Sequence, residues 1–410
     1  MNCSSLHGFR AVAESTPSSN EQGATMLARS PDRVAEYLAA IHRLAPLIAQ
    51  HRASFDEERR LPDVLFNALA DAGLFRLWLP EALGGPELSP SEFMTVVEAA
   101  SALDGSVGWL VGNGAGMSRL GGYLSASVAR DWFADQRAFV VSATAPGAVA
   151  LRVEGGYRVT GRWPFGSGAH HATRFMGLTS LKDADGKDEP PLCCYFDSRD
   201  VVIHDTWRVS GLRATGSCDF EVIDLFVPEQ HTHGFLDHEA TVEGVVYRMP
   251  INSSFPWTVS VVPLGIARGA MDAFAELSAR KTRAGTSALL RDREIVQGNF
   301  GRVAVLHQAA RAFLIHAMAE LMSAMSEGGP RLVQARAMFR VSCTHASESA
   351  MRIVDMLAAE AGAISIFESC LMERFVRDVH AAAKHLAMAP NNYTVAGRLG
   401  LGLDAGTVRF

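Results

Sequence analysis

The stretch Gly155-Gly156-Tyr157-Arg158-Val159-Thr160-Gly161-Arg162-Trp163-Pro164-Phe165-Gly166-Ser167-Gly168 carries the clearest structural signal in the chain. Its first half alternates as a β-strand does, with Tyr157 and Val159 on one side. Its second half is a turn in which two glycines permit a close backbone approach and Ser167 supplies a hydroxyl. Trp163 and Phe165 can exclude water there, so the turn suits a flat aromatic ligand. An ordinary strand and hairpin is the alternative interpretation.

Length and composition predict a multidomain globular protein. The 410 residues exceed what one hydrophobic core usually serves, and 48% hydrophobic residues suffice for several packed layers. The net charge of −6 comes from scattered residues, which argues against nucleic acid or a membrane surface as the main partner. No apolar run reaches the roughly 18 residues that span a bilayer, and no signal-peptide core is evident. The six cysteines lack CxxC spacing, so we expect a cytoplasmic protein with reduced thiols.

Hydrophobic periodicity and turn-forming residues divide the chain into a leader and domains. Residues 1–30 are polar and are expected to form a flexible leader, and residues 31–137 follow a helical period. Short β-branched and aromatic runs predict a β domain over residues 138–230. The helical period returns over residues 231–410, where Glu327-Gly328-Gly329-Pro330 is expected to separate two long antiparallel helices. The predicted class is α+β, with helices, strands and then helices.

Several segments, in this order, resemble the acyl-CoA dehydrogenase superfamily. They are Gly73-Leu74-Phe75 with residues 79–85, residues 142–147, 155–168, 207–217, 263–270 and 293–301. The resemblance implies that family's fold: an N-terminal helical domain, a central β-barrel-like domain and a C-terminal four-helix bundle. It also implies a homotetramer, in which the 293–301 region helps to hold flavin across a subunit boundary.

The C-terminal region indicates the branch of the superfamily. Arg374-Phe375-Val376-Arg377-Asp378 matches the family's R-x-x-R-D motif. In many dehydrogenases a glutamate base follows this motif and removes a proton alpha to a thioester, but here Leu386 stands at its place, after His385. A leucine cannot accept a proton. Residues 380–385 and 161–168 resemble instead the branch that uses reduced flavin and oxygen to hydroxylate small, often aromatic, molecules.

The resemblance thus implies a two-component flavin-dependent monooxygenase, an oxidoreductase. Such an enzyme takes reduced FMN or FAD from a separate reductase, and with O2 forms a flavin C4a-hydroperoxide that survives only where water is excluded. A separate reductase is expected because no nicotinamide-binding unit is evident in the chain. The expected substrate is a small aromatic or heteroatom-bearing molecule. An acyl-CoA dehydrogenase or oxidase acting on an acyl thioester is the alternative, and a flavin-free binding subunit is a second one.

By resemblance, the candidate catalytic residues are Ser167, Ser142 and His385. Ser167 is expected to hydrogen-bond flavin N5, and Ser142 to lie near the flavin or the substrate. His385 either takes a proton from the substrate or hydrogen-bonds the distal peroxide oxygen, and a satisfied histidine inside the bundle is the structural alternative. The cofactor-binding candidates besides Ser167 are Thr144, Trp163, Phe165, Arg213, Thr215, Ser217, Arg293 and Phe300.

The substrate pocket is expected at Asn113, Met117 and His385. Several phenol hydroxylases carry a second histidine on the helix after a Gly-Trp pair, but residues 110–117, which follow Gly108-Trp109 here, contain no histidine. No metal site is expected, because His170-His171 and His231-x-His233 lack further ligands at a suitable spacing. Gly112-x-Gly114-x-Gly116 is a poor dinucleotide fingerprint, because no strand precedes it and no acidic residue follows at the required distance.

Overall fold

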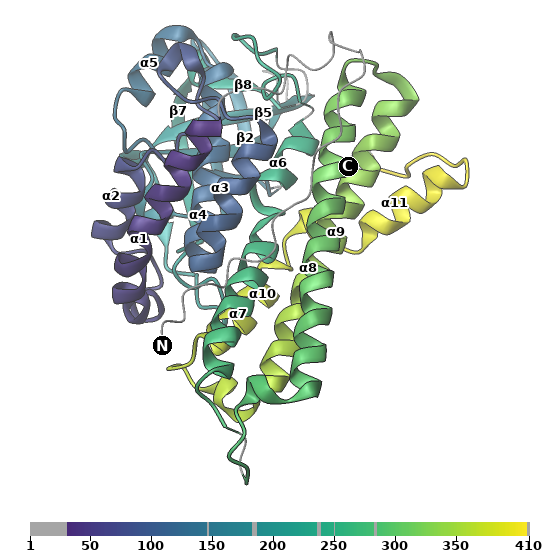
Figure 1. Ribbon diagram of the computed structural model, residues 1–410. Helices are drawn as coiled ribbons and strands as arrows, with labels where there is room; N and C mark the ends of the chain where they lie inside the picture. The colour runs from purple at the N-terminus through teal and green to yellow at the C-terminus, as the bar shows by residue number, and fades with distance from the viewer. Residues whose placement is uncertain are drawn as a thin grey trace.

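The computed structural model describes residues 31–145, 147–182, 187–235, 239–249, 251–282 and 285–407. The predicted leader therefore lies outside the described residues. In the described part, helices come first, a β-sheet follows, and helices return to the C-terminal end (Figure 1). This order confirms the predicted α+β class. Every helix among the described residues is too short or too polar to span a bilayer.

The N-terminal helices lie within residues 31–137, where the sequence predicts a helical period. Pro62 immediately precedes the second helix, where its fixed φ suits a helix start. The third helix begins with a reciprocal capping box: the Glu92 amide donates to the Ser89 hydroxyl, and the Glu92 carboxylate accepts from the Ser89 amide at 2.8 Å. The helices are α1 Pro31–Glu58, α2 Asp63–Asp71, α3 Pro90–Leu103, α4 Gly105–Met117 and α5 Ala126–Phe133.

Helix α4 is rich in glycine because it passes close to other backbones. A Cβ atom at Gly108 would collide with Ser101 of α3. Cβ atoms at Gly112 and Gly116 would collide with Thr258 of helix α6, Ile251–Val259. The glycine run therefore serves helix packing, as its poor match to a dinucleotide fingerprint suggested.

The central sheet runs in the order β6-β7-β3-β2-β4-β5-β8, and β1 pairs with β4 in parallel. The strand predicted in the first half of residues 155–168 is β3, which pairs antiparallel with β7 and continues to Gly166, through Trp163 and Phe165 that were expected in the turn. The last strand lies just past the predicted boundary at residue 230. The strands are β1 Val140–Ala143, β2 Val149–Val153, β3 Gly156–Gly166, β4 Arg174–Lys182, β5 Asp188–Asp197, β6 Val202–His204, β7 Cys218–Pro228 and β8 Thr232–Gly234.

The C-terminal helices pack on one another and on the N-terminal helices. The long helices α8 and α9 lie side by side (Figure 1), and the glycines at their junction, Gly328 and Gly329, both have positive φ, as the predicted break requires. Helix α7 packs on α3, and α10 packs on α7, α9 and α4. These contacts join the bundle to the rest of the core. The remaining bounds are α7 Val262–Ser278, α8 Glu294–Met325, α9 Gly329–Ala361, α10 Leu371–Ala382 and α11 Asn391–Gly400.

Gly112→Ala should destabilise the protein by about 1–3 kcal/mol, because the added methyl group meets the Thr258 carbonyl. Urea unfolding followed by circular dichroism measures this change. Gly397→Ala is the matched control: Gly397 is exposed in α11 with nothing near its Cβ position. That variant should gain up to about 1 kcal/mol from helix propensity. Equal stability of the two variants would contradict the close-packing explanation.

Candidate functional site

The predicted ligand turn includes the bulged end of β3 and the residues after it. The pairing with β7 shifts register between Trp163 and Gly166. Phe165 adopts φ +65° and Gly168 φ +83°, and a Cβ at Gly168 would lie 2.5 Å from the Phe139 ring. The Gly168 amide donates to the Thr215 carbonyl at 2.7 Å. The turn is therefore attached to Thr215, within the segment 207–217 that also carries the family resemblance.

A chain of hydroxyl groups connects these two segments. The Ser167 and Ser217 oxygens lie 2.8 Å apart, and the Ser217 and Thr215 oxygens 2.7 Å apart. The Thr215 hydroxyl donates to the Leu212 carbonyl at 2.8 Å. Thr215 and Ser217 are buried, whereas Ser167 is half-buried. Ser167 is therefore the member of the chain that can meet a ligand.

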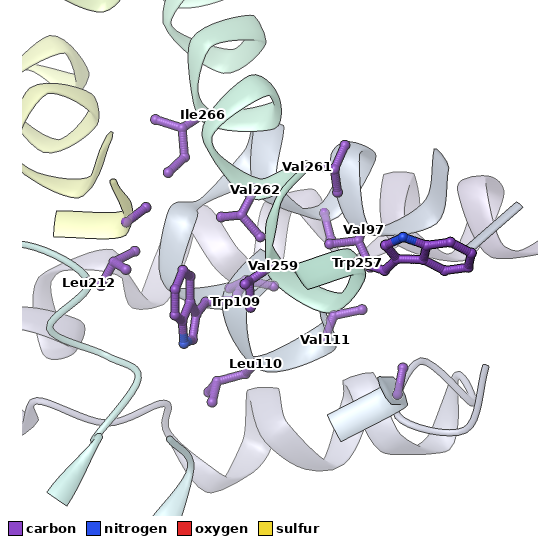
Figure 2. Packing of buried hydrophobic residues seen from close by; sticks show 14 of the residues in the cluster. Val97, Trp109, Leu110, Val111, Leu212, Trp257, Val259, Val261, Val262 and Ile266 are labelled. Carbon is purple, nitrogen blue, oxygen red and sulfur yellow. The ribbon is translucent and has the colours of Figure 1, made fainter. Parts of the chain in front are cut away.

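Trp109 of α4 contacts the outer end of the hydroxyl chain. Its Nε1–H donates to the Ser167 oxygen at 3.1 Å. The indole lies among buried apolar side chains, with Leu212, Val259 and Leu110 in the same cluster (Figure 2). The His385 ring stands edge-on to it, with 5.5 Å between ring centroids. The structure thus brings together Ser167, Trp109 and His385 from the β domain, α4 and the end of α10.

The other pocket candidates on α4 occupy different positions. The Asn113 side chain is half-buried and donates to the Trp109 carbonyl at 2.9 Å, which places it one turn along the helix from Trp109. Met117 packs in a second cluster with Leu120 and Tyr195. Asn113 therefore lies beside the Trp109 site, while Met117 faces another part of the core.

His385 directly follows the last turn of α10 and caps a short helix, Leu386–Met388. Its Nδ1 accepts a hydrogen bond from the Ala387 amide at 3.2 Å. Burial, together with the positive charge of Arg340, lowers the pKa of His385 to about 4. The ring is therefore neutral near pH 7 with its proton on Nε2, which leaves Nε2 as a donor. Leu386 is 65% exposed.

A buried carboxylate supports the hydroxyl chain from the side of α10. Asp378 Oδ1 accepts from the Leu212 amide at 2.7 Å. Burial, together with the nearby Asp104 carboxylate, raises the pKa of Asp378 to about 7. Among the described residues, Asp378 Oδ2 has no hydrogen-bond partner. Arg374 and Arg377 of the same motif instead bind Asp56 of α1, at 2.8 and 2.7 Å.

Several cofactor candidates lie along the edge of the turn. Ser142 is half-buried in β1, whose Val141 would be 3.2 Å from a Cβ at Gly166, and Thr144 is exposed just beyond that strand. Phe165 is 68% exposed beside the turn. Trp163 is fully buried, donates to the Leu178 carbonyl at 2.9 Å and stacks on Phe220. The structure therefore gives Trp163 a place in the sheet core and leaves Phe165 available to a ligand.

The remaining candidates lie at other places. Arg213 Nε donates to the Val209 carbonyl at 3.0 Å, and its Nη1 is 4.0 Å from Asp56 of α1. Phe300 lines a cavity of about 440 Å³ at the start of α8, where it stacks on Phe274. Arg293 immediately precedes α8 at this end of the helix. These two residues belong to a region separate from the Ser167 site.

The residues around Ser167 fit a flavin. A flat ring needs an open surface lined by apolar groups, and a polar atom at its edge needs a hydrogen-bonding partner. The exposed Phe165 ring and the glycine-bearing turn supply the apolar surface, and the half-buried Ser167 hydroxyl supplies the hydrogen-bonding partner. A bound flavin would supply oxygen activation at this position.

Reasoning from the sequence did not assign roles to Trp109, Asp378 and Arg340. The Gly108-Trp109 pair and the R-x-x-R-D motif were noticed only as landmarks. Their contacts with Ser167 and Leu212 depend on packing between distant segments. Arg340 gives no local signal, because it is one arginine in a long amphipathic helix.

Comparisons with known proteins identify the family of the chain. Family models match the chain as an acyl-CoA dehydrogenase N-terminal domain over residues 38–134 and C-terminal domain over residues 257–390. HsaA, the oxygenase subunit of a flavin-dependent monooxygenase of Mycobacterium tuberculosis, is 30% identical over 90% of this chain and 96% of its own length. Indole-3-acetate monooxygenase of Pseudomonas putida is 27% identical over 85% of this chain and 89% of its own.

A solved structure has the same fold over nearly the whole chain. XiaF from a Streptomyces species, determined with FADH2 and glycerol, superimposes with a TM-score of 0.84 at 26% identity and covers 92% of this chain and 97% of its own. The chain belongs to the acyl-CoA dehydrogenase family. Within that family it is a member of the flavin-dependent monooxygenases, and the relatives favour this assignment over an acyl thioester dehydrogenase.

Asp378→Asn should make the protein's stability less dependent on pH. The folded state holds the Asp378 proton up to about pH 7, whereas an unfolded aspartate releases it near pH 4. The unfolding free energy of the wild type therefore falls as pH rises through this window, by up to a few kcal/mol from this group. Asparagine keeps an acceptor for Leu212 but has no proton to lose.

Urea unfolding from pH 4.5 to 8 tests this expectation. The unfolding free energy of Asp378→Asn relative to the wild type should rise with pH and level off above pH 7. Asp272→Asn, which removes an exposed carboxylate on α7, is the matched control. Parallel curves for Asp378→Asn and the wild type would show that Asp378 ionises alike in the folded and unfolded states.

Proposed function

We propose that this protein is the oxygenase component of a two-component system that inserts one oxygen atom of O2 into a small aromatic substrate. The observation that carries the proposal is the joining of Ser167, Trp109 and His385 at one apolar site. A half-buried hydroxyl can hold the edge of a flavin there, and the surrounding rings exclude water. The membership in the monooxygenase branch supports the same conclusion.

The cofactor is reduced FMN or FAD, delivered by a separate reductase. XiaF was determined with FADH2, which supports a reduced flavin at the matching site here. Ser167 would hydrogen-bond flavin N5, and Ser142 of β1 and Thr144 just after it would border the ring. Phe165 would cover one side of the cofactor. The half-buried Ser167 and the exposed Phe165 support this arrangement.

His385 acts as a hydrogen-bond donor to an oxygen atom of the reacting partners. Its Nδ1 already accepts from Ala387, so the neutral ring carries its proton on Nε2 and cannot take another there. The lowered pKa keeps the ring neutral over the working pH range. Of the two roles that the sequence left open, hydrogen bonding is therefore the one we propose.

The substrate lies against Trp109 and Asn113, close to His385. An aromatic ring is favoured because the side chains around Trp109 are apolar, and because one relative is an indole-3-acetate monooxygenase. A thioester substrate is disfavoured because Leu386, at the position where many acyl thioester dehydrogenases carry their base, cannot accept a proton.

The protein assembles as a homotetramer through its C-terminal helices. Exposed large apolar side chains are frequent there, as in Ile295 and Val305 of α8 and in Ile366 and Phe367 after α9. A neighbouring copy would then cover the cavity beside Phe300, and Arg293 would help to hold that copy's flavin. The described cysteines are free thiols, which supports a reducing, cytoplasmic location.

Oxygen-isotope incorporation tests this function. The purified protein, a flavin reductase, NADH and FMN or FAD are incubated with ¹⁸O2 and a panel of phenols, indoles and aromatic amines. We expect one ¹⁸O atom in a product that requires both proteins. Bleaching of a tightly bound oxidised flavin by an acyl-CoA, without any oxygenated product, would support the dehydrogenase instead.

His385→Ala should lower kcat by about 10²-fold, the usual cost of losing a placed donor, while flavin affinity changes little. His385→Gln retains an amide donor and should lose no more than about tenfold. A general base could not be replaced by an amide, so equal losses in both variants would reject the donor role. His380→Ala is the control, because His380 is exposed on α10 and pairs with Asp355.

A further inference from the structure

We propose that Thr215 and Ser217 are positioning residues that fix the Ser167 hydroxyl as a hydrogen-bond acceptor. The fixed direction makes the site prefer reduced over oxidised flavin. The inference rests on the proposed placement of flavin N5 beside Ser167, and it deepens that function by naming what selects the redox state. It follows from counting hydrogen atoms along the buried chain.

The direction of the chain is set at its inner end. The Leu212 carbonyl can only accept, so the 2.8 Å contact with Thr215 requires the Thr215 hydroxyl to donate. A hydroxyl has one hydrogen to give. Thr215 must therefore accept in its 2.7 Å contact with Ser217, which makes Ser217 the donor there.

The same count reaches Ser167. Since Ser217 has given its hydrogen to Thr215, it must accept in the 2.8 Å contact with Ser167. The Ser167 hydrogen is thereby directed inward. Trp109 Nε1 can only donate, and it fills one lone pair of the Ser167 oxygen. What Ser167 offers to a ligand is its remaining lone pair.

This lone pair distinguishes the two redox states of a flavin. Reduced flavin carries a hydrogen on N5 and can donate to Ser167, whereas oxidised flavin has only a lone pair on N5. Against oxidised flavin, two acceptors would face each other without a hydrogen between them. A buried acceptor left without a donor is costly. The site therefore favours the form that the reductase supplies.

The surroundings oppose a reversal of the hydrogen-bond direction along the hydroxyl groups. Thr215 and Ser217 are 1% and 3% exposed, so water has little access to supply an alternative partner. Two hydrogen bonds fix the backbone of this segment. The Gly168 amide donates to the Thr215 carbonyl, and the Leu212 amide donates to Asp378. Reversal would turn the Thr215 lone pairs toward the Leu212 carbonyl. The direction is thus built into the fold before any ligand arrives.

The test measures binding rather than turnover. Dissociation constants for reduced FMN and FAD, measured anaerobically, are compared with those for the oxidised forms. Thr215→Val removes the inner donor, which frees Ser217 to donate to Ser167 and Ser167 to donate to N5. In this variant the preference for reduced flavin should be about fivefold or more lower than in the wild type, which corresponds to the net free energy of one hydrogen bond.

Two variants control for a merely structural effect. Thr215→Ser keeps the hydroxyl and should restore the wild-type preference. Thr179→Val removes another buried threonine hydroxyl that donates to a backbone carbonyl in the β domain, Thr179 to Leu192 at 3.0 Å, and should leave the preference unchanged. An equal loss in Thr179→Val would overturn the inference, because general loosening would then explain it.

A double-mutant cycle isolates the path through Ser167. In a Ser167→Ala background, Thr215→Val should have no further effect on the redox preference. One outcome overturns the inference while the proposed function stands. In that outcome the wild type binds flavin and Ser167→Ala changes the redox preference, but Thr215→Val leaves it unchanged. If the wild type binds neither redox state, the proposed function fails together with the inference.

Discussion

The hydrogen bond from the Leu212 amide to Asp378 is the contact on which the rest of the site depends. It joins α10 to the segment 211–217, at a point where Gly211 packs against the backbone of Arg377. Beside it, Arg374 and Arg377 bind Asp56 of α1. Asp378 therefore stands where all three helical and sheet regions meet, and small movements there would displace the hydroxyl chain.

A second constraint is the close passage of α4 through the core. Its glycines let the helix approach α3 and α6, which carries Trp109 to the turn after β3. There the indole donates to Ser167 and faces His385. Close packing and hydrogen-bond direction thus act together. Because the apolar surroundings exclude water, the few hydrogen bonds within them keep a single arrangement.

Much of the fold could be predicted from the sequence because its signals are local. Alternation marked β3, helical periodicity marked α1 and α2, and the two glycines after Glu327 marked the break between α8 and α9. The site was only partly predictable. Ser167 and His385 were recognised by resemblance, whereas the partners that orient them lie far away in sequence, as Trp109 does at 58 residues from Ser167.

The sequence by itself determined the order of helices and strands, the family and the chemical groups available for catalysis. Only the tertiary structure decided which of those groups meet and in which protonation state. It placed Trp163 in the sheet core, directed Arg213 toward Asp56, and gave His385 a neutral ring with its proton on Nε2. The physical reason is that burial and hydrogen-bond direction belong to contacts between distant segments, which local patterns do not encode.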